Sequence, residues 1–514
     1  MSREAMSSVD AAWLHMERPT NLMMINGFFL FDGPMAFEQF KETVENRLVS
    51  RFKRFRQRVV ESGLIMHSPH WETDERFDIN THIHRVALPE PGDEATLYEM
   101  ISDLAGTPLD FSKPLWQFHL IEGYGADTVA FFRLHHCIAD GIALMQVMLS
   151  MCDTEPDAPQ PEPRPARRPA GPLDGVFGLI DFASHALETT RKLTGMVIQE
   201  GMESLANPSH IWDLTKSTAA YGTALARLTL LPVDTKTLYK GPLGVSRRVA
   251  WSEPFGMDEV KALCKASNAS LNDVILSVVT GALGDYMQER GAQTDGITIK
   301  AMMPVNLRSP EKALKELGNY FGLVVPTLPL GEADPVARLK LVNQDMTAIK
   351  STPEATVALA ILQAMGSAPT EIENLGIAFF TSKTSAVITN VPGPGQQLYF
   401  GGQAIRTVMG WVPQGGDIGM GISIFSYNGQ VVVGIITDEG LVPDPERIVH
   451  HLKVEYGRLR EALLEKAEVK AEAEAKAAAQ AAVKSIYCQA TTKSGNPCRL
   501  RAQPGSEFCH VHQK

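Results

Sequence analysis

The sequence contains no run of about 18 apolar residues, the length that a membrane-spanning helix requires. Its beginning, MSREAMSSVD, lacks the basic segment followed by an apolar segment that marks a secretory signal. It has no Gly-x-Ser-x-Gly motif, so a serine-hydrolase triad on a nucleophile elbow has no support. The net charge of −11 argues against a surface that binds nucleic acid throughout. Because the sequence shows neither a membrane-spanning run nor a secretory signal, we expect a cytoplasmic protein.

The length of 514 residues exceeds what one hydrophobic core organises, so two large domains are expected. Strand and helix patterns alternate irregularly, with long loops, which predicts a mixed α/β (α+β) fold rather than a regular βαβ repeat. Changes in composition predict an N-terminal domain at 1–154, a proline-rich linker with connecting helices at 155–245, and a second domain at 246–464. An Ala/Glu/Lys spacer helix at 465–484 and a small module at 485–514 follow.

One short segment, residues 135–141 with the sequence HHCIADG, combines polar groups in a place where a core sequence would be apolar. It follows a predicted buried strand at 128–134 and precedes a helical pattern. Buried polar groups without hydrogen bonds cost about 1–3 kcal/mol each, so these groups need partners or a function. We interpret the segment as a site.

The chemistry available to this segment depends on which histidine faces a substrate. Neighbouring side chains on extended backbone point to opposite faces, so His135 and His136 cannot both face one reacting atom. An imidazole titrates near neutral pH and can take a proton from an attacking alcohol. Asp140 could orient an imidazole, or could instead hold the loop rigid. A metal site is disfavoured because adjacent histidines diverge and no carboxylate lies at ligand spacing.

The HHCIADG segment matches the HHxxxDG signature shared by CoA-dependent acyltransferases and condensation domains. Further motifs appear in an order that resembles the bacterial wax ester synthase/diacylglycerol acyltransferase family, over about residues 11–463. They are PLW at 114–116, RR at 247–248, the ND motif at 272–273, MPVNLR at 303–308, GN at 318–319 and NVPGP at 390–394.

This resemblance implies two domains of the chloramphenicol-acetyltransferase type that enclose a tunnel. It implies transfer of a long-chain acyl group from acyl-CoA to a fatty alcohol or diacylglycerol, without a covalent intermediate or a catalytic cofactor. His136 would be the general base, with His135, Asp140 and Gly141 as supports. Asn272 would contribute a polar donor from the second domain.

Other interpretations of these residues remain open at this level. His136 could be a hydrogen-bonded core histidine, and Asn272 could be the N-cap of the helix that follows. Asp273 is expected to cap or pair structurally, and Pro114 and Trp116 are expected to pack rather than bind substrate. For the whole protein, a condensation-type enzyme with a carrier-bound donor or an amine acceptor is one alternative. A non-catalytic scaffold is the other.

Helical patterns at 175–231 carry many apolar and small residues. They are expected to pack on the domains or bridge them. A peripheral contact with the inner membrane or with lipid inclusions is the alternative, because an amphipathic helix can also bury its apolar face in lipid.

The six cysteines fall into two groups. Cys137, Cys152 and Cys264 lie in apolar context and are expected to be small buried hydrophobes. The other three end the chain in the pattern Cys488-x9-Cys498-x10-Cys509-x2-His512.

Three thiolates and an imidazole form the ligand set of a closed structural zinc site. A segment of 30 residues cannot build a core unaided, so bound zinc would supply its folding free energy. The segment resembles small zinc-ribbon-like modules. His510 is an alternative fourth ligand, and unliganded thiols are the alternative to a metal. Lys493, Arg499 and Arg501 suit an anionic partner, whose identity the sequence leaves open.

Overall fold

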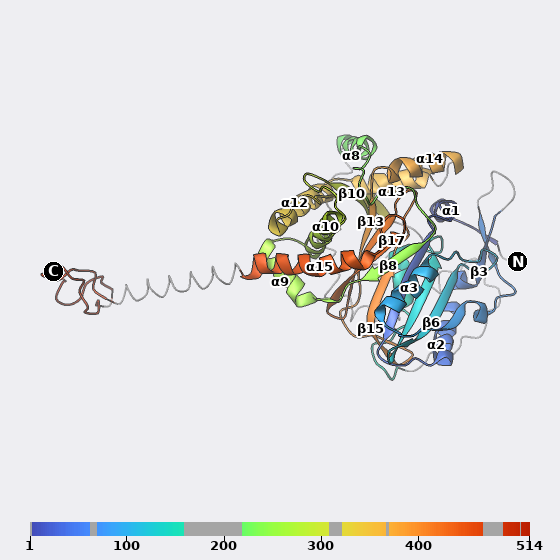
Figure 1. Cartoon of the computed structure of the whole chain (residues 1–514), viewed down its shortest axis with the longest axis horizontal. Coiled ribbons are helices and arrows are strands. Elements are labelled where there is room, and N and C mark those ends of the chain that lie inside the picture. Colours follow the sequence, from blue (N-terminus) through green and yellow to red (C-terminus); the bar gives the residue numbers. More distant parts are fainter. Residues whose placement is uncertain are drawn as a thin grey trace.

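Figure 1 presents the computed structural model, which describes residues 3–61, 69–158, 218–307, 321–365, 370–465, 487–503 and 505–513. Several predicted features lie outside these residues. They are most of the proline-rich linker and its helices, Arg308, the 318–319 motif and nearly all of the spacer helix.

The first half of the chain builds a six-stranded sheet around an aromatic core. The order is β14-β15-β2-β7-β6-β5, and only the β5–β6 pair is parallel. The strands are β5 (Ile83–Ala87), β6 (Trp116–Tyr124), β7 (Asp127–His135), β2 (Met24–Phe31), β15 (Gln403–Trp411) and β14 (Tyr399–Phe400). Consecutive phenylalanines of β2 and β7 are buried, so both faces of these central strands are covered, which explains why the strands form from near-continuous apolar runs.

Helices and a small sheet complete this half. The helical elements are α1 (Ser8–His15), α2 (Phe37–Val44), η1 (Glu45–Val49), η2 (Lys53–Arg56), η3 (Ile79–Thr81), α3 (Glu94–Ala105) and α4 (Gly141–Leu149). The small antiparallel sheet has the order β1 (Arg3–Ala5), β4 (His70–Thr73), β3 (Gln57–Val60).

The second half forms an eight-stranded mixed sheet of order β11-β10-β13-β16-β17-β8, with β12 beside β10 and β9 beside β17. Its strands are β8 (Arg247–Trp251), β9 (Phe255–Gly256), β10 (Ile299–Asn306), β11 (Phe321–Val324), β12 (Thr327–Leu328), β13 (Ala386–Pro392), β16 (Met420–Tyr427) and β17 (Gln430–Asp438). Strand β13 pairs with β10 on one side and with β16 on the other, both in parallel, so it is an interior strand of the sheet.

The helices of this half pack on the sheet and on one another. They are α8 (Thr218–Leu230), α9 (Met257–Ser267), α10 (Leu271–Glu289), α12 (Pro335–Lys350), α13 (Glu354–Met365), α14 (Thr370–Thr381), α15 (Pro445–Arg460) and η4 (Glu461–Glu465). Helix α10 is buried along its length between α12 and α15, whereas α8, α13 and α14 lie together on one side of the molecule (Figure 1).

One segment of the C-terminal half of the chain belongs to the sheet of the N-terminal half. Strands β14 and β15 come from the C-terminal half but extend the N-terminal sheet, where β15 pairs with β2. The division into 1–154 and 246–464 stays a prediction, and the strand pairing adds that residues 399–411 extend the sheet of the N-terminal half. The physical reason is that β2 would otherwise expose an unpaired hydrophobic edge, which β15 covers.

Two hairpins follow from local sequence. Apolar runs flank Gly123-Tyr124-Gly125 and Asn428-Gly429, which predicts turns there, and the hairpins β6–β7 and β16–β17 form at these places. Asn428 and Gly429 both adopt positive φ (47° and 72°). The alternation of apolar and polar residues predicts a strand over 79–86, but residues 79–81 form the turn η3 before β5 begins. The pattern of residues 36–52 predicts one amphipathic helix, and this helix ends in one turn of π-helix, η1. Among the described residues, no helix is long and apolar enough to span a bilayer.

Candidate active site

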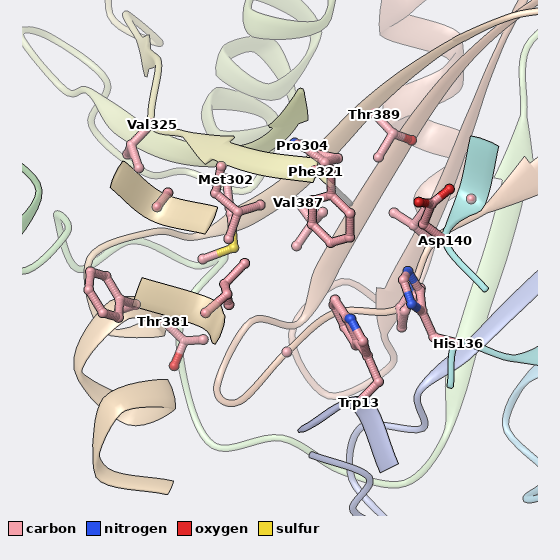
Figure 2. A pocket seen from close by; sticks show the side chains of 18 of the residues that line it. Trp13, His136, Asp140, Met302, Pro304, Phe321, Val325, Thr381, Val387 and Thr389 are labelled. Carbon is pink, nitrogen blue, oxygen red and sulfur yellow. The ribbon is translucent and has the colours of Figure 1, made fainter. Parts of the chain in front are cut away.

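His136 lies in the loop between β7 and α4 and faces a pocket between the two halves. Its backbone N–H donates to the carbonyl of Met23 on the neighbouring chain segment (2.7 Å), which fixes the loop. Its imidazole stacks on Trp13 of α1, with 3.9 Å between ring centroids, and meets the edge of Phe321 (Figure 2). These contacts hold the ring in one plane at the pocket wall.

His135 does not line the pocket. Its Nδ1 accepts the Cys137 N–H (3.1 Å), so a neutral ring carries its proton on Nε2 and donates it to Glu17 Oε2 (3.0 Å). Glu17 also accepts the Met23 N–H (2.8 Å). The two histidines thus point to opposite sides, as the alternation of extended backbone predicts, and His135 anchors the loop from behind.

Asp140 is the N-cap of α4, and its Oδ1 accepts the Ala143 N–H (2.8 Å). This hydrogen bond joins Asp140 to the first turn of α4. Gly141 is the first residue of α4, and it lines the pocket with Asp140. A Cβ at Gly141 would meet no atom within 4 Å, so the glycine leaves open space beside His136.

The pocket encloses about 1580 Å³ of non-atom space, its open mouth included. His136, Asp140 and Trp13 lie at one side of it, and Val325 and Thr381 lie at the other, with Phe321 and Val387 between them (Figure 2). Most of the remaining lining side chains are aliphatic or aromatic and come from both halves of the chain. The arrangement suits a long apolar ligand that presents one reactive group to His136.

The second half brings Asn272 close to this pocket but not into its wall. Asn272 is buried in the first turn of α10, and its Oδ1 accepts from Asn390 Nδ2 (3.2 Å). Asn390, at the end of β13, does line the pocket. The Nδ2 of Asn272 is buried and has no hydrogen-bond partner among the described residues. Asn272 and Asn390 therefore form a hydrogen-bonded pair, of which Asn390 lines the pocket, and a direct role of Asn272 in the site stays a prediction.

The alternative that Asn272 caps α10 is wrong. Ser270 is the N-cap, and Asp273 completes a capping box with it, so Asn272 is one residue inside the helix. The expected structural role of Asp273 is confirmed, and Asp273 also accepts a hydrogen bond from Asn343 (2.9 Å).

Of the other motifs, PLW and RR serve the framework, whereas Pro304 and Asn306 of the MPVNLR motif line the pocket. Trp116 is fully buried, donates its indole N–H to the Phe55 carbonyl (2.9 Å) and stacks on His82, so its expected packing role is confirmed. Arg247 forms a buried ion pair with Asp438 (2.6 Å) and donates to the Thr20 carbonyl, which ties the N-terminal segment to the second sheet.

Sequence reasoning missed Trp13, Glu17, Phe321 and the pocket role of Asn390. Trp13 and Glu17 lie more than a hundred residues before the histidines, and only the pairing of β2 with β7 brings them together. The sequence carried a signal for Asn390, since this residue ends an apolar run and begins the NVPGP motif of the resembling family.

At the C-terminal end, Cys488, Cys498, Cys509 and His512 converge, and their ligand atoms all lie within 4.8 Å of one another. His512 Nδ1 is 3.4 Å from Cys488 Sγ and 3.2 Å from Cys509 Sγ. The Cys498 and Cys509 sulfur atoms are 3.8 Å apart. His510 is exposed and outside the cluster, so these four residues form the candidate metal site.

The fold and the pocket together define the class of enzyme. Two sheets enclose an apolar pocket that presents the second histidine of an HHxxxDG segment, which is the arrangement of an acyltransferase. Residues 6–275 match the wax ester synthase/diacylglycerol acyltransferase catalytic domain, and residues 317–460 match the WS/DGAT C-terminal domain. The chain belongs to the wax ester synthase/diacylglycerol acyltransferase family and is an O-acyltransferase.

Individual relatives agree with this assignment. A probable diacylglycerol O-acyltransferase of Mycobacterium tuberculosis, tgs2, is 29% identical over 473 residues, which cover 88% of this chain and 98% of the relative. A putative diacylglycerol O-acyltransferase of the same species is 28% identical over 460 residues, which cover 86% of this chain and 87% of the relative.

The fold is shared with solved structures. The wax ester synthase/diacylglycerol acyltransferase from Marinobacter aquaeolei VT8 superposes with a TM-score of 0.64 at 20% identity, over 90% of this chain and 99% of that one. The first condensation domain of the calcium-dependent antibiotic synthetase has a TM-score of 0.55 at 14% identity, over 90% and 96% of the two chains.

Proposed function

We propose that the protein transfers a long-chain fatty acyl group from acyl-CoA to the hydroxyl of a fatty alcohol or a diacylglycerol, giving a wax ester or a triacylglycerol. The observation that carries this proposal is the position of His136, an imidazole in the wall of an otherwise largely apolar pocket. The named activities of the relatives and the apolar lining support lipid substrates for this chain.

In the proposed mechanism, His136 takes the proton of the acceptor hydroxyl as the oxygen attacks the thioester carbonyl carbon. Collapse of the tetrahedral intermediate breaks the C–S bond, and the imidazolium returns the proton to the departing CoA thiolate. The products are the ester and free CoA, so atoms and charge balance without an acyl-enzyme. Stacking of Trp13 on the ring supports a fixed direction of proton transfer.

The oxyanion of the intermediate needs donors, each worth about 3–4 kcal/mol in comparable sites. We assign this role to the amide of Asn390, which Asn272 orients through the hydrogen bond between their side chains. His135 and Asp140 act as positioning residues for the loop that carries His136. Gly141 provides room for the reacting groups.

Replacement of the base is the direct test. His136→Ala is expected to lower the rate of CoA release from palmitoyl-CoA and hexadecanol by about 10²–10⁴-fold, because no other group would take the hydroxyl proton. The matched control is His450→Ala, an exposed histidine of α15, which should leave the rate unchanged. Activity retained in His136→Ala would refute the assignment of the base.

The acceptor is tested by comparing hexadecanol, diacylglycerol and a long-chain amine in the same CoA-release assay. Transfer to either alcohol supports the proposal. Preference for the amine, or activity only with a carrier-bound donor, would instead establish a condensation-type enzyme. Absence of transfer to every acceptor in the folded protein would favour a non-catalytic scaffold.

We further propose that the C-terminal cluster binds one structural Zn²⁺ through Cys488, Cys498, Cys509 and His512. Zinc–thiolate bonds of about 2.3 Å in a tetrahedron place the sulfur atoms about 3.8 Å apart. The Cys498–Cys509 separation of 3.8 Å fits that geometry. Zinc would supply the folding free energy of a module whose buried core consists essentially of the cysteines themselves.

Elemental analysis of the purified full chain tests this site. We expect about one zinc per chain in the wild type and in His510→Ala, and much less in Cys509→Ser, because three ligands hold the ion less tightly than four. The histidine variant controls for loss of a neighbouring imidazole. Well under one zinc per wild-type chain, or equal zinc in both variants, would contradict the assignment.

We propose that the enzyme works in the cytoplasm, peripherally at the inner membrane or at lipid inclusions, because its acceptors and products dissolve in lipid rather than in water. The zinc module, with Lys493, Arg499 and Arg501 at exposed positions, is proposed to contact an anionic partner.

A further inference from the structure

Two elements that wall the pocket also carry large apolar side chains on the outside of the molecule. Leu230 at the end of α8 is 79% exposed, and Leu375 of α14 is 72% exposed. We call the whole set the collar. It consists of Leu225, Leu230, Val233, Ile372, Leu375 and Phe379.

The opposite faces of the same elements line the pocket. Leu228 and Leu231 contribute from α8 and the residue that follows it, and Ile377 and Phe380 contribute from α14. On α14, the collar residues are spaced by three and four positions and so share one face, distinct from the face that lines the pocket. A helix with apolar side chains on two different faces is expected to bury both of them, so its outer face needs an apolar partner.

The two parts of the collar lie near each other, because α8 and α14 are joined at their C-terminal ends. Lys383 Nζ donates to the carbonyls of Leu228 (3.0 Å) and Thr229 (2.6 Å) and lies 3.7 Å from the centre of the Phe379 ring. The Asp234 N–H donates to the Ser382 carbonyl (3.1 Å). The two helices also lie on the same side of the molecule in Figure 1.

Cationic side chains lie next to the collar. Arg18 is exposed and donates to Asn374 Oδ1 of α14 (2.7 Å). Asn374 directly precedes Leu375 of the collar in the sequence. Lys236 is exposed three residues after Val233. An apolar area with neighbouring cations matches the chemistry of a phospholipid surface, where phosphate groups border the acyl chains.

We propose that the collar docks on a phospholipid surface and turns the α8–α14 end of the pocket toward the lipid. This inference rests on the proposed function, since it assigns a role to the collar as the route by which the acceptor and the ester product move between lipid and pocket. Transfer along a continuous apolar path avoids exposing their hydrocarbon chains to water.

The experiment is flotation of the full chain with phosphatidylcholine vesicles that contain a minor share of phosphatidylglycerol. The test variant is Leu230→Glu/Leu375→Glu, two collar positions that do not line the pocket. The matched control is Leu341→Glu, a leucine of α12 that is 45% exposed and outside the collar. The wild type and the control should float with the vesicles. The double variant should bind roughly tenfold or more weakly, because it places two charges where apolar area is buried.

A second measurement separates docking from folding and from the proposed function. Transfer to hexanol in vesicle-free solution should be equal in all three proteins, whereas transfer to diacylglycerol held in vesicles should fall only in the double variant. If none of them acylates hexanol, hexadecanol or diacylglycerol but flotation still depends on the collar, docking stands and the proposed function fails.

Three results would overturn the proposal. The first is a wild type that does not float. The second is a double variant that floats like the wild type, which would locate lipid binding elsewhere in the chain. The third is a wild-type dimer that the double variant abolishes while vesicle binding is absent, which would assign the collar to a second copy of the chain.

Discussion

At the scale of single residues, the candidate base is held by groups that the motif does not contain. Trp13 fixes the plane of His136, and Glu17 fixes His135 behind it. Both come from α1 and the residues just after it, so the N-terminal segment supports the loop that carries the motif. The consensus motif is therefore only part of the site.

Removal of Glu17 tests this support. Glu17→Ala would leave the buried His135 Nε2–H and the Met23 N–H without their acceptor, each at a cost of about 1–3 kcal/mol. We expect a lower melting temperature and a lower kcat with an almost unchanged KM, because His135 does not line the pocket.

Glu17→Gln keeps an acceptor oxygen and should recover much of the loss, whereas the exposed Glu75→Ala should behave as wild type. An unchanged kcat in Glu17→Ala would show that the loop does not depend on this bond.

At the scale of elements, strand β15 joins the two halves, and Gly27 of β2 is closely packed between β15 and β7. A Cβ at Gly27 would lie 2.5 Å from the Phe132 ring and 2.7 Å from the Met409 carbonyl oxygen. The ring is buried on the neighbouring strand and the carbonyl is backbone, so neither can move aside cheaply.

Gly27→Ala should therefore destabilise the protein by about 1–3 kcal/mol or more, as overpacking does in other cores. Gly457→Ala is the control, because a Cβ there meets no atom within 4 Å and alanine is the better residue inside α15. Thermal unfolding should show a lower melting temperature for the first variant and an equal or higher one for the second. The reverse order would contradict the close approach of β15.

Elements that depend on local pattern were predictable, and elements that depend on a distant partner were not. The Asn428-Gly429 turn and the β6–β7 hairpin follow from turn chemistry and apolar alternation. Strand β15 was not predicted, because its pairing with β2 spans almost four hundred residues of sequence. Helix α14 was missed as well, since its apolar residues face both the pocket and the outside.

At the scale of the whole molecule, the pocket belongs to neither half alone. His136, Asp140 and Trp13 come from the first half, whereas Asn390, Phe321 and the α8–α14 end come from the second. The candidate metal site is separate from this arrangement, because all four of its residues lie beyond the family domains, which end at residue 460. Catalysis and metal binding can therefore be tested with independent variants.

The sequence by itself determined the family, the HHxxxDG segment and the four residues of the candidate metal site. Each of these is a matter of residue types at short or ordered spacing, which the chain carries whatever its fold. Only the tertiary structure decided which histidine faces the pocket, that Asn390 lies in its wall with Asn272 behind it, and that Trp13 and Glu17 contact His136 and His135. Those outcomes depend on long-range strand pairing and helix packing, which bring together side chains that no local pattern relates.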